Sequence, residues 1–534
     1  MHLIDDPWIP IRRASGKTEL IRPAQIAESD DPVVALTSCR PDFNGALTQF
    51  LIGLLQTAFA LRNDDEWEQY LEKPPSMEAL QEAFAKVSHA FQLNGDGPRF
   101  MQDFDPLENR LNDSQLKNAT KPIGALLIDA PGDQTLRNNA DHFIKRGHAE
   151  ALCPACAATA LFTLQTNAPS GGAGHRTSIR GGGPLTTLVI LDPEGGQLSS
   201  TLWRDLWLNI LPKATKLTGN PELTKPHHTF PWLAPTRTSD KKGQDTTPED
   251  ASPLQMYWAM PRRVRLDFDA TDSGPCDLCG MESDNRLHRY VTLNYGTNYT
   301  GAWRHPLSPY QERRDTEPLP LHPQPGGISY RLWSDLIYNQ PEGNQGISPA
   351  IVVREFMRNK LDEEQLRLWT FGYDMDNMKP RCWYETTLPL YLVPNEIRTE
   401  FSGRVEQLIK GAEYVADLLR RQIKQAWFKR PGDIRGDVSF LADGFYQHTE
   451  GNFYTCARDL IQAIPEDTDY DILARWHRIV VKAAFDMFDE WTTAGDIAFS
   501  DPRRIAQARE SLRKGLYAKK LTRQILPIQK EKAA

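Results

Sequence analysis

Apolar residues recur at helical spacing in four segments near the C-terminal end of the sequence. Each segment presents one apolar stripe, which is typical of an amphipathic helix that packs against others. The fourth segment begins with Asp501-Pro502, a capping residue followed by proline at the first helical position. We therefore predict a four-helix bundle over residues 396–534. The stripes run from Val405 to Ile423, from Phe453 to Ile464, from Leu473 to Trp491 and from Ile505 to Leu516.

The preceding 395 residues have a less regular pattern. Helical spacing occurs over 44–61 and 77–91, whereas the apolar, β-branched run 185–191 (LTTLVIL) predicts a strand. Residues 235–253 (PTRTSDKKGQDTTPEDASP) contain few apolar side chains, so we expect a mobile surface loop there. Together these patterns predict an α+β domain over 1–395, followed by the all-α bundle.

Composition and charge restrict the function classes. Hydrophobic residues make up 40% of the 534 residues and charged residues 25%, as in ordinary globular proteins. The net charge of −8 means that any nucleic-acid binding must use local basic patches. Residues 502–534 contain ten Lys/Arg against two Glu, which fits either a contact surface or a solvated helix face. No secretory signal or spanning apolar run is evident, and seven cysteines suit a reducing compartment, so we expect a cytoplasmic protein.

Two CxxC pairs are the most specific chemical signal. Cys153-Pro-Ala-Cys156 and Cys276-Asp-Leu-Cys279 lie about 120 residues apart, and four thiolates suit tetrahedral zinc. A closed site of this kind leaves no position for a reactive water, so we expect one structural Zn²⁺ per chain. Gly280 provides positive φ after the second pair, and Pro154 disfavours a simple helix at the first.

Other interpretations of the cysteines stay open at this stage. A redox CxxC would require a βαβ context, and the four thiols could also be unrelated buried residues. His148-Ala-Glu150 beside Cys153 resembles part of a zinc deaminase signature, but it leaves the second pair without a role.

Two loops have the composition of nucleic-acid contacts. Residues 171–183 contain six glycines around His175, Arg176 and Arg180, which suits backbone and cationic contact with phosphate or a groove. The alternative is a flexible loop without a ligand. Residues 137–148 mix cations with His142 and Phe143, as in contacts to single-stranded RNA.

No catalytic constellation accompanies these loops. The sequence contains no evident nucleophile–base pair, catalytic carboxylate pair or open metal site, so we expect a protein that is not an enzyme. A zinc-dependent enzyme acting on nucleic acid and a scaffold binding only proteins are the alternatives.

The order of several short motifs resembles one known family. LIDDPWIPI opens the chain, and GPRFMQ, LCPACAATALF, IRGGGPLTTLV, CDLCGMES, GAWRHPLSP and FGYDMDNMKPRCW follow in that order. This succession is similar to the CasA family, the large subunits of the type I-E CRISPR surveillance complex called Cascade.

The resemblance implies a wedge-shaped N-terminal α+β domain, a C-terminal four-helix bundle and a non-catalytic role in antiviral defence. It also implies four partners: the other Cascade subunits, the guide RNA, double-stranded target DNA and the CRISPR helicase-nuclease. Such a subunit holds the 5′ handle of the guide RNA and recognises the protospacer-adjacent motif (PAM) in the DNA minor groove. It then starts strand separation and recruits the helicase-nuclease.

The resemblance also assigns roles to individual residues. The family's PAM-contacting glycine loop falls on Gly171, Gly172, Ala173 and Gly174, and its strand-separating wedge falls on Asp376, Asn377 and Met378. The RNA-handle loop corresponds to His142, Phe143, Lys145 and Arg146. Where some members have a lysine that reaches the minor groove, this sequence has Asn294, an uncharged amide.

Overall fold

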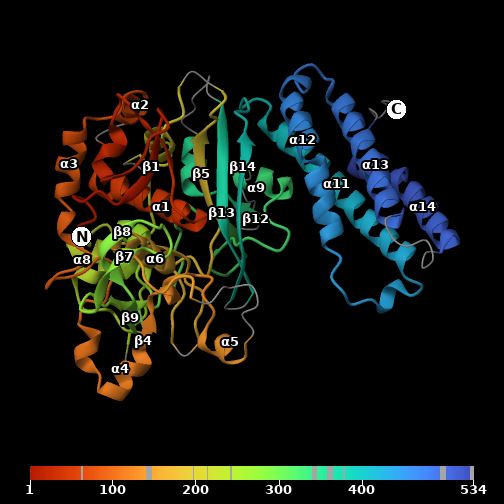
Figure 1. The fold of residues 1–534 in the computed structure, drawn as a ribbon. Coiled ribbons are helices and arrows are strands. Elements are labelled where there is room, and N and C mark those ends of the chain that lie inside the picture. Colours follow the sequence, from red (N-terminus) through yellow and green to blue (C-terminus); the bar gives the residue numbers. More distant parts are fainter. Residues whose placement is uncertain are drawn as a thin grey trace. The chain divides into compact units, whose positions relative to one another are not determined.

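The structure, a computed structural model, divides into two compact units (Figure 1). One contains residues 1–324 and 340–387, and the other contains 325–339 and 388–534. The structure describes residues 1–59, 61, 64–139, 147–172, 174–195, 198–212, 215–240, 243–338, 346–357, 365–376, 379–493 and 501–528. Among these residues, none of the helices is both long and apolar enough to cross a lipid bilayer.

The N-terminal unit is built around one helix that is buried along most of its length. This helix, α1 (Pro41–Ala58), packs against α6 (Pro154–Asn167) and α7 (Leu202–Trp207). Phe50 on α1 is fully buried, and its ring meets five aromatic rings edge to face at centroid distances between 5.3 and 5.9 Å. These rings belong to Trp8, Phe91, Phe100, Phe162 and Trp258, so segments far apart in sequence share one aromatic core.

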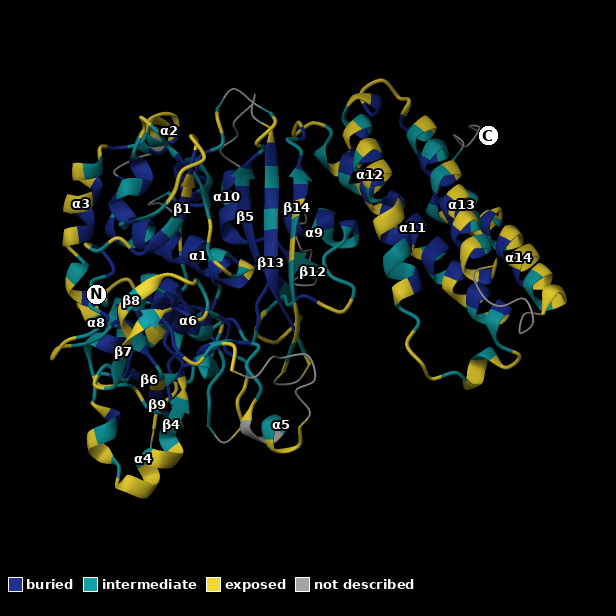
Figure 2. Ribbon diagram, viewed as in Figure 1, coloured by how far each residue is buried: buried dark blue, intermediate teal, exposed yellow. Residues whose placement is uncertain are grey.

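The described residues of this unit also form four small antiparallel sheets and one hairpin. The strand predicted at 185–191 is confirmed as β5 (Thr186–Leu191), which pairs with β13 (Leu366–Asp376), and β14 (Lys379–Leu390) follows β13 in the same sheet. Figure 2 shows β5 and β13 buried along most of their length. The remaining strands are β1 (Ile9–Arg13), β2 (Thr18–Ile21), β3 (Val33–Leu36), β4 (Thr120–Pro122), β6 (Arg263–Leu266), β7 (Thr271–Pro275), β8 (Glu282–Leu287), β9 (Arg289–Leu293), β10 (Tyr310–Glu312), β11 (Leu319–Pro320) and β12 (Gly346–Ser348).

Short helices complete the N-terminal unit. They connect the sheets and include two that bear on the sites described below: α5 precedes the RNA-handle segment, and α8 lines a cavity. These helices are α2 (Asp64–Glu72), α3 (Met77–Ala85), α4 (Asp113–Ala119), α5 (Asp133–Arg137), α8 (Pro226–Thr229) and α10 (Ile351–Phe356).

The C-terminal unit contains the four long helices expected from the apolar stripes. They are α11 (Arg398–Trp427), α12 (Phe440–Ala463), α13 (Asp469–Thr493) and α14 (Pro502–Leu516), and α11 packs against the other three. The stripe on α11 is buried at Val405, Leu408 and Leu419. Asp501 caps α14 as expected, since its carboxylate accepts a 3.1 Å hydrogen bond from the backbone N–H of Arg504.

The boundary between the units differs from the expected one at residue 395. The C-terminal unit begins at Leu388 and also includes residues 325–339, which contain α9 (Trp333–Ile337). Aromatic side chains explain this difference. Tyr330 is fully buried and stacks on Phe453 at 4.2 Å, and the Trp333 indole donates a 2.6 Å hydrogen bond to the carbonyl of Pro389.

The surface loop expected over 235–253 is confirmed only in part, because Arg237 and residues 243–245 are exposed but other described residues are buried. Thr246 is 2% exposed and Ala251 is fully buried. The backbone N–H of Thr246 donates to the carbonyl of Asn298, and its carbonyl accepts from the N–H of Thr300. Pairing with a segment about 50 residues downstream, rather than apolar content, therefore holds Thr246 in place.

The aromatic core gives a direct stability prediction. Phe50→Ala should destabilise the N-terminal unit by about 3–5 kcal/mol, because the cavity it leaves is surrounded by rings that cannot close over it. Phe440→Ala is the matched control, since Phe440 is 45% exposed and its truncation should cost less than about 1 kcal/mol. Urea unfolding followed by tryptophan fluorescence measures both values. Equal costs for the two variants would contradict the central role of Phe50.

Candidate metal centre and nucleic-acid interface

The first cysteine pair lies at the N-terminus of α6. Cys153 is the N-cap of this helix, and its Sγ accepts a 3.4 Å hydrogen bond from the backbone N–H of Cys156. The expectation that Pro154 disfavours a helix here is wrong. Proline occupies the first helical position, where the missing N–H would have no intrahelical partner. The helix start therefore directs both thiols to the same side.

The second pair lies in the turn between β7 and β8. Gly280 adopts φ +72°, as the sequence predicts, and its N–H donates to the carbonyl of Cys276 at 2.8 Å. Asp277 ties this turn to the first pair, because its carboxylate accepts from the backbone N–H groups of Glu150 and Ala151 at 2.7 and 2.8 Å. The two pairs are thus joined by hydrogen bonds as well as by their proximity.

The four sulfur atoms form a compact cluster. Cys153, Cys156 and Cys276 are buried, Cys279 is half-buried, and all four sulfurs lie within 4.8 Å of one another. The Sγ atoms of Cys153 and Cys279 are 3.8 Å apart. A tetrahedral ion with metal–sulfur bonds of about 2.3 Å requires sulfur–sulfur separations of about 3.8 Å. The cluster can therefore hold a metal ion with cysteine ligands alone.

Contacts among the four thiols shift their pKa values in opposite directions. Hydrogen bonds from Cys153 and Cys156 lower the pKa of Cys279 to about 7, while the contact with Cys153 raises the pKa of Cys156. Four adjacent thiols cannot all ionise without a compensating cation, and a bound metal ion would supply that charge. Neither His148 nor Glu150 belongs to the cluster, which weighs against the deaminase interpretation.

The glycine-rich segment forms a tight turn at residues 171–175. Gly172 and Gly174 adopt φ +66° and +88°, and the N–H of Gly171 donates to the carbonyl of His175 at 3.2 Å. A Cβ atom at Gly174 would lie 2.8 Å from the ring of Tyr295, so a side chain cannot be added there without displacing that ring. Ala173 lies outside the described residues.

The cations of this segment do not all face solvent. Arg180 is 1% exposed and donates hydrogen bonds to Gln49, Thr186 and Ser308. The expectation that Arg180 contacts phosphate is therefore wrong, because its guanidinium is used inside the core. Arg176 donates to the hydroxyl and carbonyl of Ser239 at 2.7 and 2.8 Å.

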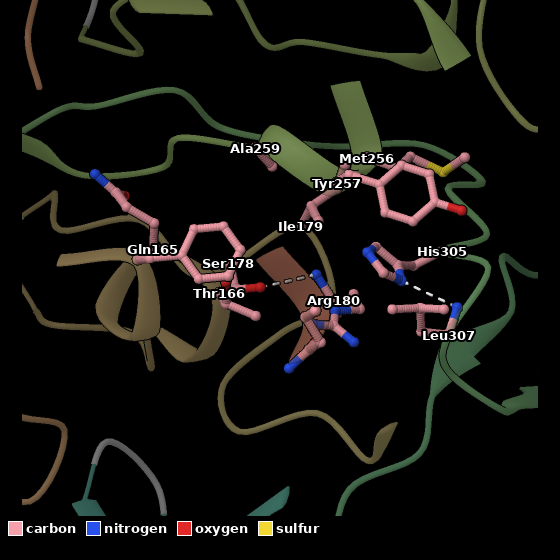
Figure 3. A pocket seen from close by; sticks show the side chains of 12 residues that line it. Gln165, Thr166, Ser178, Ile179, Arg180, Met256, Tyr257, Ala259, His305 and Leu307 are labelled. Atoms are coloured by element: carbon pink, nitrogen blue, oxygen red, sulfur yellow. Dashed lines mark hydrogen bonds between the residues drawn. The ribbon is translucent and has the colours of Figure 1, made fainter. Parts of the chain in front are cut away.

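Buried polar groups behind the glycine-rich segment enclose a small cavity. Figure 3 shows Arg180 beside Ser178, His305 and Leu307 at this cavity, whose volume is about 10 Å³. That volume accommodates about one water molecule. The cavity thus belongs to the core that supports the segment, and it has no room for a larger ligand.

An exposed aromatic residue stands beside the glycine turn. Tyr295 is 44% exposed and adopts φ +61°, an uncommon conformation for a residue with a bulky side chain. Its backbone N–H donates a 2.7 Å hydrogen bond to the carbonyl of Gly174. Sequence analysis singled out the half-buried Asn294 and missed this neighbour. The sequence signal that could have identified Tyr295 is the tyrosine followed by glycine in LNYGTNY. In the structure this tyrosine combines a strained backbone with an exposed ring.

The other family-assigned residues are only partly described. Asp376 is the last residue of β13; its side chain is 61% exposed and lies 3.8 Å from the Arg381 guanidinium. Asn377 and Met378 fall between β13 and β14, outside the described residues. The RNA-handle residues His142, Phe143, Lys145 and Arg146 also lie outside them, between α5 and the first cysteine pair.

The basic C-terminal segment is partly neutralised by carboxylates within and next to it. Arg509 pairs with Asp489 at 2.8 Å, and Arg513 pairs with Glu510 at 2.8 Å. Arg504 lies 3.4 Å from Asp501. These pairs are exposed and contribute little to stability, so they suit a solvated helix face.

Comparison with solved structures identifies the fold. CasA of Thermus thermophilus superposes with a TM-score of 0.69 and 17% identity, covering 97% of this chain and 99% of that chain. Cse1 of Thermobifida fusca gives a TM-score of 0.70 and 15% identity, covering 99% of both chains. A chain from a structure described as a CRISPR RNA-guided surveillance complex superposes with a TM-score of 0.62 and 17% identity, covering 97% of this chain and 99% of that chain.

A sequence-family model gives the same answer by an independent route. The model for CRISPR-associated protein Cse1 matches residues 2–487, most of the sequence. The names CasA and Cse1 denote the same Thermus thermophilus protein in one of the matching structures. The resemblance inferred from the motif order is therefore confirmed, and the chain belongs to the CRISPR-associated protein Cse1 family.

Proposed function

We propose that this chain is the large, non-catalytic subunit of a type I-E Cascade complex. In this role it binds the 5′ handle of the guide RNA, recognises the PAM, initiates strand separation and recruits the helicase-nuclease. Its family membership is the observation that supports this function most directly. The similarity to a chain of an RNA-guided surveillance complex supports assembly with other subunits and a guide RNA.

The glycine turn is the proposed PAM contact. Gly171, Gly172 and Gly174 present backbone without side chains, which permits close approach to a minor groove. Tyr295 stands beside this turn with an exposed ring and a phenol that can donate to minor-groove acceptors. We propose that Tyr295, together with Asn294, takes the place of the lysine found in some family members.

Strand opening and RNA binding are assigned to two further segments. Asp376, Asn377 and Met378 combine polar groups with an apolar side chain, which suits insertion beside the PAM and separation of the first base pair. His142, Phe143, Lys145 and Arg146 combine cations with aromatic rings, which suits phosphate pairing and base stacking. Both assignments rest on the family resemblance.

The cysteine cluster is the proposed site of one structural Zn²⁺. Four thiolate ligands complete a tetrahedral shell and leave no position for a substrate or a reactive water. In this arrangement the ion would fix the start of α6 against the turn between β7 and β8. The chain's own residues therefore use the ion to position loops, and they perform no chemistry with it.

The DNA-binding role is tested with the reconstituted complex on duplexes of varied PAM sequence. Omission of this chain should abolish PAM-dependent binding in a gel shift. Tyr295→Ala should weaken binding by about tenfold, because loss of an aromatic contact to nucleic acid costs about 1–3 kcal/mol. Tyr517→Ala, another tyrosine with an exposed ring, is the matched control and should leave the affinity unchanged. PAM-dependent binding that persists without the chain would refute the proposal.

The metal assignment is tested by elemental analysis of protein purified without chelators. We expect close to one zinc per chain, and loss of that zinc in Cys276→Ser because one ligand is removed. Cys382→Ser is the matched control, since this exposed thiol lies outside the cluster. A zinc content near zero in the unmodified protein, or equal content in both variants, would contradict a four-cysteine site.

A further inference from the structure

A second cavity, with a volume of about 280 Å³, lies in the N-terminal unit. Its walls come from α8, from residues 231–237 and 246–260, and from Thr297. None of its lining residues belongs to the cysteine cluster or the glycine turn. The volume is close to the lower end of the range for small-molecule sites and far exceeds one water molecule.

Three buried polar atoms at this cavity have no hydrogen-bond partner among the described residues. They are Nδ1 of His228 and the hydroxyl oxygens of Thr236 and Thr246. Thr246 is only 2% exposed, so bulk solvent does not replace the missing partner. Unsatisfied buried polar groups are destabilising and rare in native proteins. Three of them around one cavity indicate that a hydrogen-bonding occupant completes the site.

The charges at the cavity cancel. The Arg237 guanidinium lies 3.2 Å from the Asp250 carboxylate, which also accepts from the backbone N–H and hydroxyl of Thr247. Burial lowers the pKa of His228, and the neighbouring His227 and Lys225 lower it further, so its imidazole is neutral at neutral pH. A cavity without net charge does not favour phosphate or carboxylate, so the occupant should be neutral.

Part of the remaining lining is apolar. Pro231, Pro235 and Met260 supply surfaces against which a flat ring can pack. A neutral planar ring whose edge offers both donors and acceptors satisfies the hydroxyls, the imidazole and the apolar walls together. Nucleobases have this combination, and proteins bind extruded bases through edge hydrogen bonds and packing on their faces.

The cavity shares its supporting segment with the glycine turn. The backbone N–H of Tyr295 donates a hydrogen bond to the carbonyl of Gly174. Two residues further along the chain, Thr297 lines the cavity. On the other side, Ser239 accepts from Arg176 in the glycine-rich segment and donates its N–H to the carbonyl of Tyr295. Bases that leave a duplex at the proposed PAM contact would be the natural source of an occupant.

We propose that this cavity binds a single unstacked nucleobase and does not bind its phosphate. The ligand class follows from the cavity itself, and only the identification of target DNA as the source rests on the proposed function.

Saturation-transfer NMR of the full chain with deoxyadenosine, deoxyguanosine, deoxycytidine and thymidine tests this directly. At least one nucleoside should bind at millimolar concentration. Thr246→Val should weaken it by about fivefold, the equivalent of one hydrogen bond. The same variant should not lower the melting temperature, since the hydroxyl it removes has no partner within the described protein.

Thr492→Val is the matched control. The Thr492 hydroxyl is also buried, but it donates a hydrogen bond of 2.7 Å to the carbonyl of Phe488. Thr492 does not line the cavity. This variant should lower the melting temperature and leave nucleoside binding unchanged.

The proposal would be overturned if no nucleoside showed saturation transfer, as expected for a cavity filled by water only. Unchanged nucleoside affinity in Thr246→Val would also overturn it. So would a strong preference of the cavity for the free phosphate ion over nucleosides. Failure of the duplex gel shift with nucleoside binding intact would reject the proposed function and not the cavity. A normal duplex gel shift without any nucleoside binding would reject the proposed nucleobase site and leave the proposed function unaffected.

Discussion

Four cysteine sulfurs from segments about 120 residues apart meet within 4.8 Å, and this convergence joins the start of α6 to the turn between β7 and β8. Four thiols at this distance repel one another once ionised, so a cation is the simplest source of stability. The first pair sets the start of α6, which packs on the central helix α1. The second pair sets the turn from which β8 and β9 lead to Asn294 and Tyr295. One cluster therefore links the core to the proposed recognition residues.

The glycine turn is supported from three directions. Arg180 anchors its C-terminal side in the core through three neutral acceptors, and Arg176 ties it to Ser239. Tyr295 holds Gly174 by a backbone hydrogen bond while its own ring stays exposed. A turn fixed in this way can present backbone groups without the entropy cost of ordering a flexible loop. Cations that first suggested phosphate binding instead provide rigidity.

Local patterns in the sequence were sufficient for part of this architecture. The apolar stripes of α11–α14, the strand β5 and the positive φ of Gly280 each depend on neighbouring residues, and all are present in the structure. The pairing of the two CxxC motifs followed from ligand chemistry. In each of these cases the information lay within a few residues or in one repeated spacing.

Features that depend on distant contacts were not evident from the sequence. Thr246 is held by pairing with residues 298–300, and Tyr330 joins the bundle through its buried aromatic ring. The burial of Arg180 depends on Gln49 and Ser308, which lie 131 and 128 residues away along the chain. The Tyr295 ring closely approaches Gly174, a contact that no local propensity encodes.

Hydrogen–deuterium exchange with and without a chelator tests the central claim, that the cysteine cluster and the metal ion proposed for it position the recognition loops. The account predicts faster exchange in residues 147–156, 171–183 and 276–297, with unchanged protection in α11, α12 and α13. Unchanged exchange in the glycine-rich segment after complete metal loss would contradict it, as would equal loss of protection in the helical bundle.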